Sequence, residues 1–107
     1  MLTVLDVMDL KRKEDIDALI RALQYQNDTA VRAEAALSLG RLGDLRAVEP
    51  LISTLQSDSD PYVRSLAATA LGNLGDTRAQ GALLNALQSD TLEVGAAAGE
   101  ALSKLGG

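Results

Sequence analysis

The sequence predicts an all-α fold: a short right-handed α–α superhelix of three helix pairs, preceded by one further helix. Two observations carry this prediction. Val31, Val63 and Val94 occupy equivalent positions in three copies of one pattern, at spacings of 32 and 31 residues, and repeats of this length indicate stacked structural units. The apolar residues are mostly Leu and Ala, which favour helices, whereas Phe and Trp are absent and Tyr occurs twice.

The predicted repeats occupy residues 13–44, 45–76 and 77–107. Residues 1–12 form a predicted N-terminal capping helix, so that the chain is a single domain. Each repeat contains two stripes of apolar residues at the three- and four-residue steps of a helix. Because neither helix of a pair can bury its stripe alone, neighbouring repeats are expected to stack. In the second repeat the two stripes consist of Val48, Leu51, Ile52 and Leu55, and of Val63, Ala67, Ala70, Leu71 and Leu74.

Polar residues between the stripes predict where the second helix of each repeat begins. Asp28 and Asp60 suit the N-cap position, and Pro61 suits the first helical residue. In the third repeat either Asp90 or Thr91 can cap, and Glu93 stands three residues after Asp90 as in a capping box.

Glycines predict where the same helices end. Gly43 and Gly75 suit the left-handed position after the last turn, and Asp44 and Asp76 can then cap the next helix. Pro50 falls within the first helix of the second repeat, where we expect it to bend that helix.

Residues 2–10 repeat the second-helix pattern. A shift of 32 residues places Val4, Val7 and Leu10 over Ala36, Leu39 and Leu42, which predicts a helix that covers one end of the array.

The strings DPYVRSLAATALGNLGDTRAQGALLNAL and DLRAVEPLISTL resemble the HEAT-like repeats of the phycobilisome-lyase type. The Asp-x-x-Val-Arg start and the Leu-Gly-Asp end of this pattern are complete in the second repeat. The third repeat departs from it at Gly95, Gly99 and Ser103. The resemblance implies a solenoid that binds a protein partner on its concave face. Its alternative implication is a subunit or helper of a bilin lyase, for which Arg41, Lys104 and Tyr62 are the candidate residues.

Composition excludes several functions. The chain has no Cys and no His, which removes zinc sites, cysteine nucleophiles and the commonest general base. A net charge of −5 disfavours nucleic acid as a partner. The N-terminal stretch is interrupted by Asp6 and Asp9, which predicts neither a secretory signal nor a membrane span. We therefore expect a cytoplasmic, non-catalytic protein without metal or cofactor.

Three patterns allow a functional reading and a structural one. Arg32 and Arg64 could form an anion-binding ladder or, as we expect, repeated ion pairs near Asp28 and Asp60, with Asp44 and Asp76 as further partners. The segments 40–43 and 72–75 could cradle phosphate, but glycines that close helices are the expected reading. Possible catalytic carboxylates occur in turns and first helical turns, where acids cap helices, and they are Glu14, Asp15, Asp17, Asp58 and Asp60.

By the resemblance, the second helices line the concave face, and their non-consensus positions carry recognition. These candidate partner-binding residues are Ala33, Glu34, Leu37, Arg41, Tyr62, Ser65, Leu66, Thr69, Asn73, Ala97, Glu100 and Lys104, with Thr29, Ala30, Glu93 and Ala96 beside them. Leu37, Tyr62 and Leu66 lie off the buried stripe of their helices, and we expect them to form an exposed apolar strip with a charged rim. The alternative is that they are isolated surface side chains without a function.

The third repeat also predicts self-association. Its two helices are so apolar that some of their side chains should stay uncovered, and a two-fold homodimer would bury them. The residues concerned are Leu83, Leu84, Leu87, Leu92, Val94, Leu102 and Leu105. The concave strip is the competing surface for such a dimer.

Overall fold

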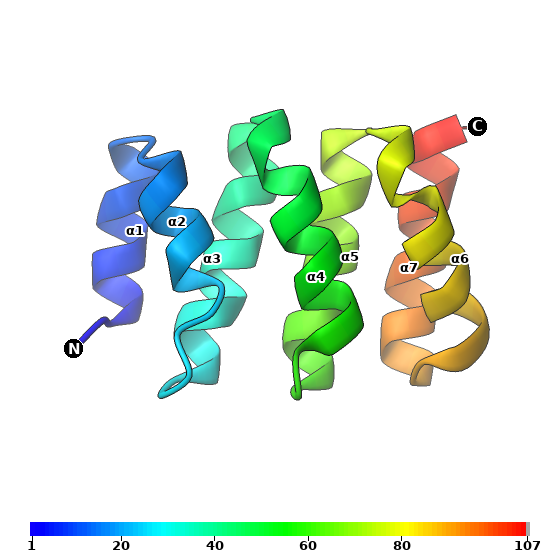
Figure 1. Ribbon diagram of the computed structural model, residues 1–107, viewed down its shortest axis with the longest axis horizontal. Helices are drawn as coiled ribbons and strands as arrows, with labels where there is room; N and C mark the ends of the chain where they lie inside the picture. The colour runs from blue at the N-terminus through cyan, green and yellow to red at the C-terminus, as the bar shows by residue number, and fades with distance from the viewer. Residues whose placement is uncertain (107) are drawn as a thin grey trace.

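In the computed structural model, residues 1–106 are described and form seven α-helices with two short 3-10 helices (Figure 1). No strand occurs within this range, so the prediction of an all-α solenoid is confirmed. Gly107, the last residue of the third predicted repeat, lies outside the described residues. The α-helices are α1 (Val4–Arg12), α2 (Ile16–Ala22), α3 (Thr29–Leu42), α4 (Val48–Ser57), α5 (Pro61–Leu74), α6 (Gln80–Ser89) and α7 (Leu92–Gly106), and the 3-10 helices are η1 (Leu45–Ala47) and η2 (Thr77–Ala79).

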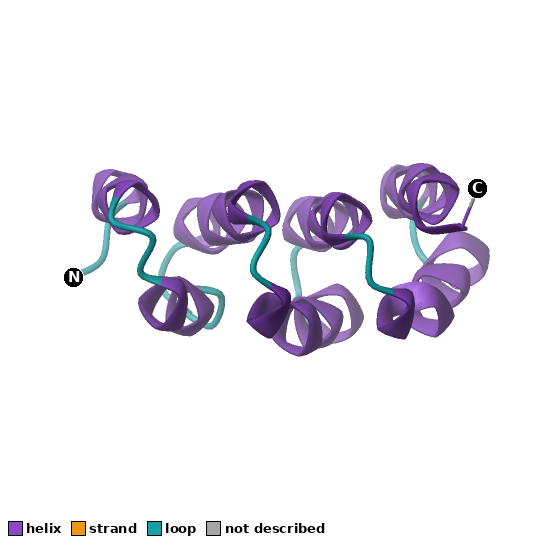
Figure 2. Ribbon diagram, turned by 90° about the horizontal axis from the view of Figure 1, so that it is seen from above, coloured by secondary structure: helices purple, strands orange, loops and turns teal. Residues whose placement is uncertain are grey.

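The helices form two layers in a body of 36 × 24 × 16 Å (Figure 2). One layer holds α1, α3, α5 and α7, each packed on the next, and the other holds α2, α4 and α6. We call the first the second-helix layer, because α3, α5 and α7 are the second helices of the three repeats. In Figure 2 α1 and α7 lie slightly farther from the other layer than α3 and α5 do, which makes the outer face of this layer slightly concave.

The core between the layers is aliphatic and continuous along the array. The equivalent residues Val31, Val63 and Val94 are all fully buried, as are Leu19 and Leu51 of the opposite layer. Full burial of each such side chain stabilises the fold by about 1.5–3 kcal/mol. The repeated apolar positions of the sequence therefore form one shared core.

The predicted helix starts are confirmed in the first two repeats. Asp28 accepts a hydrogen bond from the amide of Ala30, and Asp60 accepts one from the amide of Tyr62. In the third repeat the hydroxyl of Thr91 accepts from the amide of Val94 and so caps α7. The loop before α7 contains two residues where the loop before α5 contains three, which locates the residue that the third repeat lacks.

The predicted helix ends are confirmed as well. Gly43 and Gly75 have φ of +75° and +69°, the left-handed conformation that glycine adopts without strain. Asp44 and Asp76 then cap η1 and η2.

The prediction that Pro50 bends the interior of a helix is wrong. Pro50 is the third residue of α4, within the first turn, where backbone amides have no acceptor inside the helix. The change from 3-10 to α-helix occurs before it, at Val48. The third repeat makes the same change at Gln80 without a proline, so Pro50 is accommodated by this break and does not cause it.

The predicted N-terminal helix is confirmed as α1, which packs on α2 and α3 and buries Val7 completely. It begins with a capping box, in which Thr3 and Asp6 each accept a hydrogen bond from the other's backbone amide. Glu14, in the turn that follows, has a φ of +55°, the only positive value at a non-glycine residue within 1–106.

The second helices approach closely at two glycines. A Cβ atom added to Gly40 would lie 2.8 Å from the Cα of Ala70, and one added to Gly72 would lie 2.8 Å from the Cα of Ala101. At the equivalent place α7 has Ser103, which is exposed.

Leucines remain uncovered on the third repeat, as expected. Leu83 and Val94 are fully buried, but Leu84, Leu87 and Leu92 are 43%, 45% and 95% exposed.

Candidate functional site

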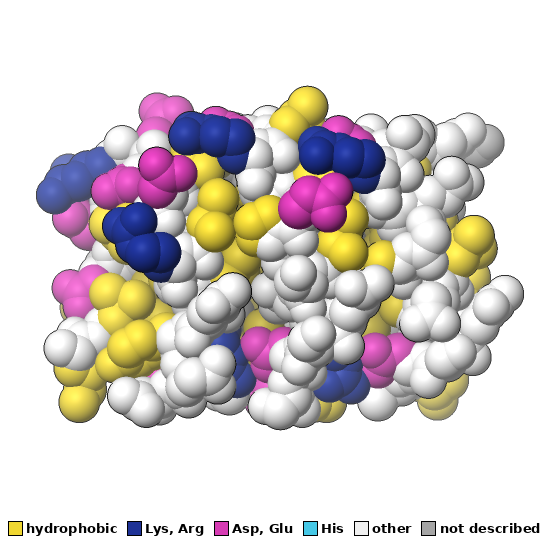
Figure 3. All heavy atoms as spheres, viewed as in Figure 1, with side chains coloured by type: hydrophobic (Ala, Val, Ile, Leu, Met, Phe, Trp, Pro, Cys, Tyr) yellow, Lys and Arg dark blue, Asp and Glu magenta, His cyan; other side chains and the backbone are white. Residues whose placement is uncertain are grey.

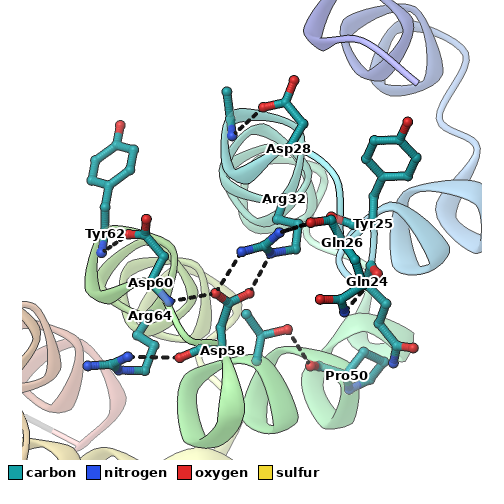
Figure 4. A network of polar contacts seen from close by, with 12 residues as sticks. Gln24, Tyr25, Gln26, Asp28, Arg32, Pro50, Asp58, Asp60, Tyr62 and Arg64 are labelled. Atoms are coloured by element: carbon teal, nitrogen blue, oxygen red, sulfur yellow. Dashed lines mark hydrogen bonds and ion pairs between the residues drawn. The ribbon is translucent and has the colours of Figure 1, made fainter. Parts of the chain in front are cut away.

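Two arginines, Arg32 buried and Arg64 partly exposed, connect successive repeats (Figure 4). The Nε and Nη2 atoms of Arg32 donate to Asp58 at 2.8 and 3.2 Å, and its Nη1 donates to the carbonyl of Tyr25 at 3.0 Å. Arg64 makes the same bidentate pair with Asp90 at 3.0 and 2.9 Å, and donates to the carbonyl of Asp58 at 2.8 Å. We call these two pairs the arginine ladder.

The ladder corrects the partners that we expected for these arginines. Asp28 and Asp60 cap their own helices, whereas each arginine reaches the aspartate of the next repeat, 26 residues further along. Asp44 and Asp76 are not partners either, because they pair with Arg46 and Arg78. Since the guanidinium groups are occupied by carboxylates and carbonyls, the anion-binding reading is also wrong.

A second set of ion pairs links the repeats near η1 and η2. Arg46 lies 3.6 Å from Asp17, and Arg78 lies 3.7 Å from Glu49, in each case on the first helix of the preceding repeat. All four side chains are about half exposed or more, so each pair contributes about 0–1 kcal/mol. In Figure 3 charged side chains gather toward the two ends of the helices, and uncharged ones fill much of the space between.

Arginine neighbours lower the pKa of several aspartates. Hydrogen bonds from Arg64 hold the pKa of Asp90 below its ordinary value, against the opposing effect of burial. Hydrogen bonds from Arg46 and Arg78 lower the pKa of Asp44 and Asp76 in the same way. A lowered pKa favours the ionised carboxylate, which is the form that pairs with arginine. None of these three aspartates has the raised pKa of a general acid.

Three of the possible catalytic carboxylates make contacts that stabilise the fold. Asp58 is 7% exposed and belongs to the arginine ladder, while Asp15 and Asp60 cap helices. The glycines of segments 40–43 and 72–75 end helices or permit their close packing.

The expected partner-binding residues differ in their exposure. Arg41, Tyr62, Asn73, Glu100 and Lys104 are exposed, as are Thr29, Ala30, Glu93 and Ala96. A second group is half-buried, and comprises Glu34, Leu37, Leu66, Thr69 and Ala97. Ala33 and Ser65 are buried, at 4% and 8% exposure, and so offer little surface to a partner, although Ala33 lines one of the hollows described below.

Three of these residues are also less available than the sequence suggested. The hydroxyls of Ser65 and Thr69 donate to carbonyls of their own helix, those of Tyr62 and Ser65. Leu66 packs against the core, so that only Tyr62, at 56% exposure, stands out from the expected apolar strip.

Two hollows meet on the second-helix layer. The apolar hollow, of about 270 Å³, is lined by Val4, Ala30, Ala33, Glu34, Leu37, Tyr62 and Leu66. The basic hollow, of about 390 Å³, is lined by Met8, Lys11, Arg12, Glu14, Glu34, Arg41 and Leu42. Because Glu34 borders both, the two hollows are neighbours on α1, α3 and α5, and we call the two together the α1–α3–α5 groove.

The contribution of α1 to this groove was not predicted from the sequence. Val4, Met8 and Lys11 were read only as parts of a covering helix, although their spacing places them on one helical face. Residues expected on α7 do not line the groove. Lys104 donates to Asn73, and Glu100 borders a different hollow beside Leu87 and Leu92.

Residues 1–106 contain no group of three or more acidic, His or Cys side chains that could hold a metal ion. Within the same range, no helix is long and apolar enough to cross a membrane.

A family model described as HEAT repeats matches the chain twice, at residues 2–64 and 48–107. A search of the curated proteins found no match.

Proposed function

Since the chain belongs to the HEAT-repeat family, whose repeats generally mediate protein–protein interaction, we propose that it is a non-catalytic adaptor. Its partner binds the outer face of the second-helix layer. The observation that carries this proposal is the α1–α3–α5 groove, in which side chains from three helices border two neighbouring hollows.

The chemistry of the groove supports a protein ligand. Its apolar part offers Leu37, Leu66 and the exposed ring of Tyr62, and its margin offers Glu34 and Arg41. An apolar centre with a polar rim, and Tyr or Arg at the contact, is how protein interfaces are built. Side chains that pair across repeats hold the groove in place, so the protein loses little conformational freedom when a partner binds.

The test compares two matched double variants in affinity capture from the source organism, read by quantitative mass spectrometry. Tyr62→Ser with Arg41→Ser removes one exposed apolar and one basic side chain from the groove. Leu45→Ser with Arg21→Ser removes the same two kinds of side chain from the opposite layer. Circular dichroism should show that both variants stay helical.

The proposal expects that some proteins are captured by the wild type and by the Leu45/Arg21 double variant. The Tyr62/Arg41 double variant should not capture these proteins. If the captured proteins are instead lost from the Leu45 variant alone, the binding face is the opposite layer and the proposal is wrong.

The narrower resemblance to the phycobilisome-lyase type, with a bilin-handling function, is the weaker proposal. A bilin needs polar groups for its propionates together with an apolar cavity. Arg41 and Tyr62 line different hollows, and Lys104 is engaged with Asn73 on the far side of α5. Absorbance of the purified protein after incubation with phycocyanobilin tests this alternative directly.

A further inference from the structure

The α1–α3–α5 groove has two ends of different chemistry. At the apolar end Val4, Leu37 and Leu66 are half-buried, and Tyr62 stands 56% exposed beside them. At the basic end Lys11 of α1 and Arg41 of α3 line the same hollow as Met8 and Leu42.

Lys11 and Arg41 differ from most basic side chains of this protein. Five arginines and Lys13 are ion-paired, and Lys104 donates a hydrogen bond to Asn73. Lys11 and Arg41 make neither kind of contact with another side chain in residues 1–106, although the chain has 15 acidic residues and 10 basic ones. Two cations without side-chain partners in residues 1–106 therefore line one hollow.

Helix ends explain part of this arrangement. Lys11 and Arg41 lie in the last turns of α1 and α3, where a positive charge interacts favourably with the terminal carbonyls. That interaction does not require a cation here, because α5 has Asn73 at the position of Arg41. It also leaves donors of both side chains free for a carboxylate.

Acidic residues restrict where such a carboxylate can bind. Glu34 lies between the two hollows and Glu14 borders the basic one, and each would repel a second carboxylate placed against it. The favourable position for a carboxylate is therefore in contact with Lys11 and Arg41 and away from Glu14 and Glu34.

We propose that the α1–α3–α5 groove binds a linear peptide segment with apolar side chains on one side of an acidic one. The apolar side chains pack on Val4, Leu66 and Tyr62, and the carboxylate accepts hydrogen bonds from Lys11 and Arg41. This inference rests on the adaptor function proposed above and specifies the class of partner.

The experiment pans a random dodecapeptide phage library against the purified protein and against three variants. Lys11→Glu with Arg41→Glu reverses the charge of the basic end, and Tyr62→Ser removes the exposed ring of the apolar end. Arg21→Glu is the matched control, because Arg21 is an exposed arginine of α2 that likewise has no ion pair within residues 1–106. Enriched peptides are then synthesised with a fluorophore, and their affinities are measured by anisotropy.

The proposal expects enriched sequences that combine Leu, Ile, Met or aromatic residues with Asp or Glu. Replacing the acidic residue of such a peptide by its amide should weaken binding about ten-fold or more, since a hydrogen bond to a charged group contributes roughly 1.5–3 kcal/mol. The charge-reversed variant should select Lys or Arg instead, Tyr62→Ser should lose the peptides, and Arg21→Glu should behave as the wild type.

Other outcomes overturn the proposal in distinguishable ways. Peptides that need Tyr62 but show no acidic preference would refute the acidic partner and leave the adaptor function standing. A library without any enrichment, together with a sedimenting mass that Tyr62→Ser lowers, would show that a second copy of the chain occupies the groove. Peptides insensitive to both groove variants would contradict the proposed function as well.

Discussion

Arg32 and Asp58 form a bidentate ion pair between adjacent repeats, with only 5% and 7% of their side chains exposed. Arg64 and Asp90 form the equivalent pair between the second and third repeats, and residues 1–106 contain no third copy. Gly95 follows Val94 where the third repeat would carry its arginine, and Gln26 stands where the first repeat would carry its aspartate. Within residues 1–106, neither Gln26 nor Gly95 adds a buried charge that lacks a partner, which would be costly.

Removing Arg32 should destabilise the protein strongly. In Arg32→Met the carboxylate of Asp58 stays buried without its cation, and loss of one partner from a buried pair costs about 3–5 kcal/mol. Urea denaturation followed by circular dichroism measures the change. Arg64→Met is the matched comparison, and we expect a smaller cost because its pair is 17% exposed on each side. Equal losses in the two variants would contradict the role assigned to burial.

Asp90 should make the protein sensitive to acid. Its pKa in the folded state lies below the ordinary value, so its stabilising effect is complete above about pH 4 and is lost as the pH falls toward the folded-state pKa. Asp90→Asn should lower the free energy of unfolding at pH 7 and reduce the decline of that free energy as the pH falls below about 4. Urea titrations at each pH measure both. A variant whose decline matches the wild type would show that other carboxylates, such as Asp44 and Asp76, control acid unfolding.

Gly72→Ala should weaken the packing of α5 on α7. The added methyl group would lie 2.8 Å from the Cα of Ala101, a backbone atom, so the two helices must separate. We expect a loss of about 1–3 kcal/mol, the usual cost of overpacking. Gly81→Ala is the control, because that position in α6 has no neighbour within 4 Å, and alanine there should stabilise the helix by up to about 1 kcal/mol. Thermal unfolding compares the two, and opposite signs are expected.

The fold was predictable because its signals are local. The caps at Asp28 and Asp60 and the left-handed Gly43 and Gly75 follow from residue type and spacing, and all were found where expected. Repeated ion pairs of Arg32 and Arg64 were expected and are present, but their partners were predicted wrongly, because each partner lies in the next repeat while the nearest aspartate in sequence is a cap.

The candidate site was predicted less well, because exposure in a solenoid depends on the neighbouring repeat. Ala33 and Ser65 lie off their own helix's apolar stripe, yet they are buried. Leu66 is half covered for the same reason. The helical period of one segment therefore predicts which face is inward, and does not predict how far the next helix covers its flanks.

Glu14→Gly should stabilise the turn between α1 and α2. Glu14 has a φ of +55°, and the left-handed conformation costs a residue with a side chain about 1–2 kcal/mol. Glycine relieves that cost but loses more conformational freedom on folding, so we expect a net gain of about 0.5–1 kcal/mol. Urea denaturation measures it. Glu14→Ala retains a Cβ and serves as the control, and an equal gain in that variant would mean that backbone strain is not the cause.

The uncovered leucines of the third repeat predict a homodimer. Leu84, Leu87 and Leu92 are 43%, 45% and 95% exposed, and the last two line a hollow of about 530 Å³ between α6 and α7, together with Gly95 and Gly99. In a two-fold dimer the same apolar patch of each subunit packs against that of the other, so both patches are buried.

Sedimentation equilibrium at micromolar concentration tests the dimer, and we expect a mass approaching twice the 11.2 kDa of one chain. Leu87→Ser with Leu92→Ser should return the mass to that of one chain with little loss of helix, because both side chains are largely exposed. Leu45→Ser, at an exposed leucine of η1 in the second repeat, should leave the mass unchanged. A mass near 11.2 kDa at every concentration would reject the dimer. If the Leu87 variant stays dimeric while Tyr62→Ser does not, the contact lies on the α1–α3–α5 groove instead.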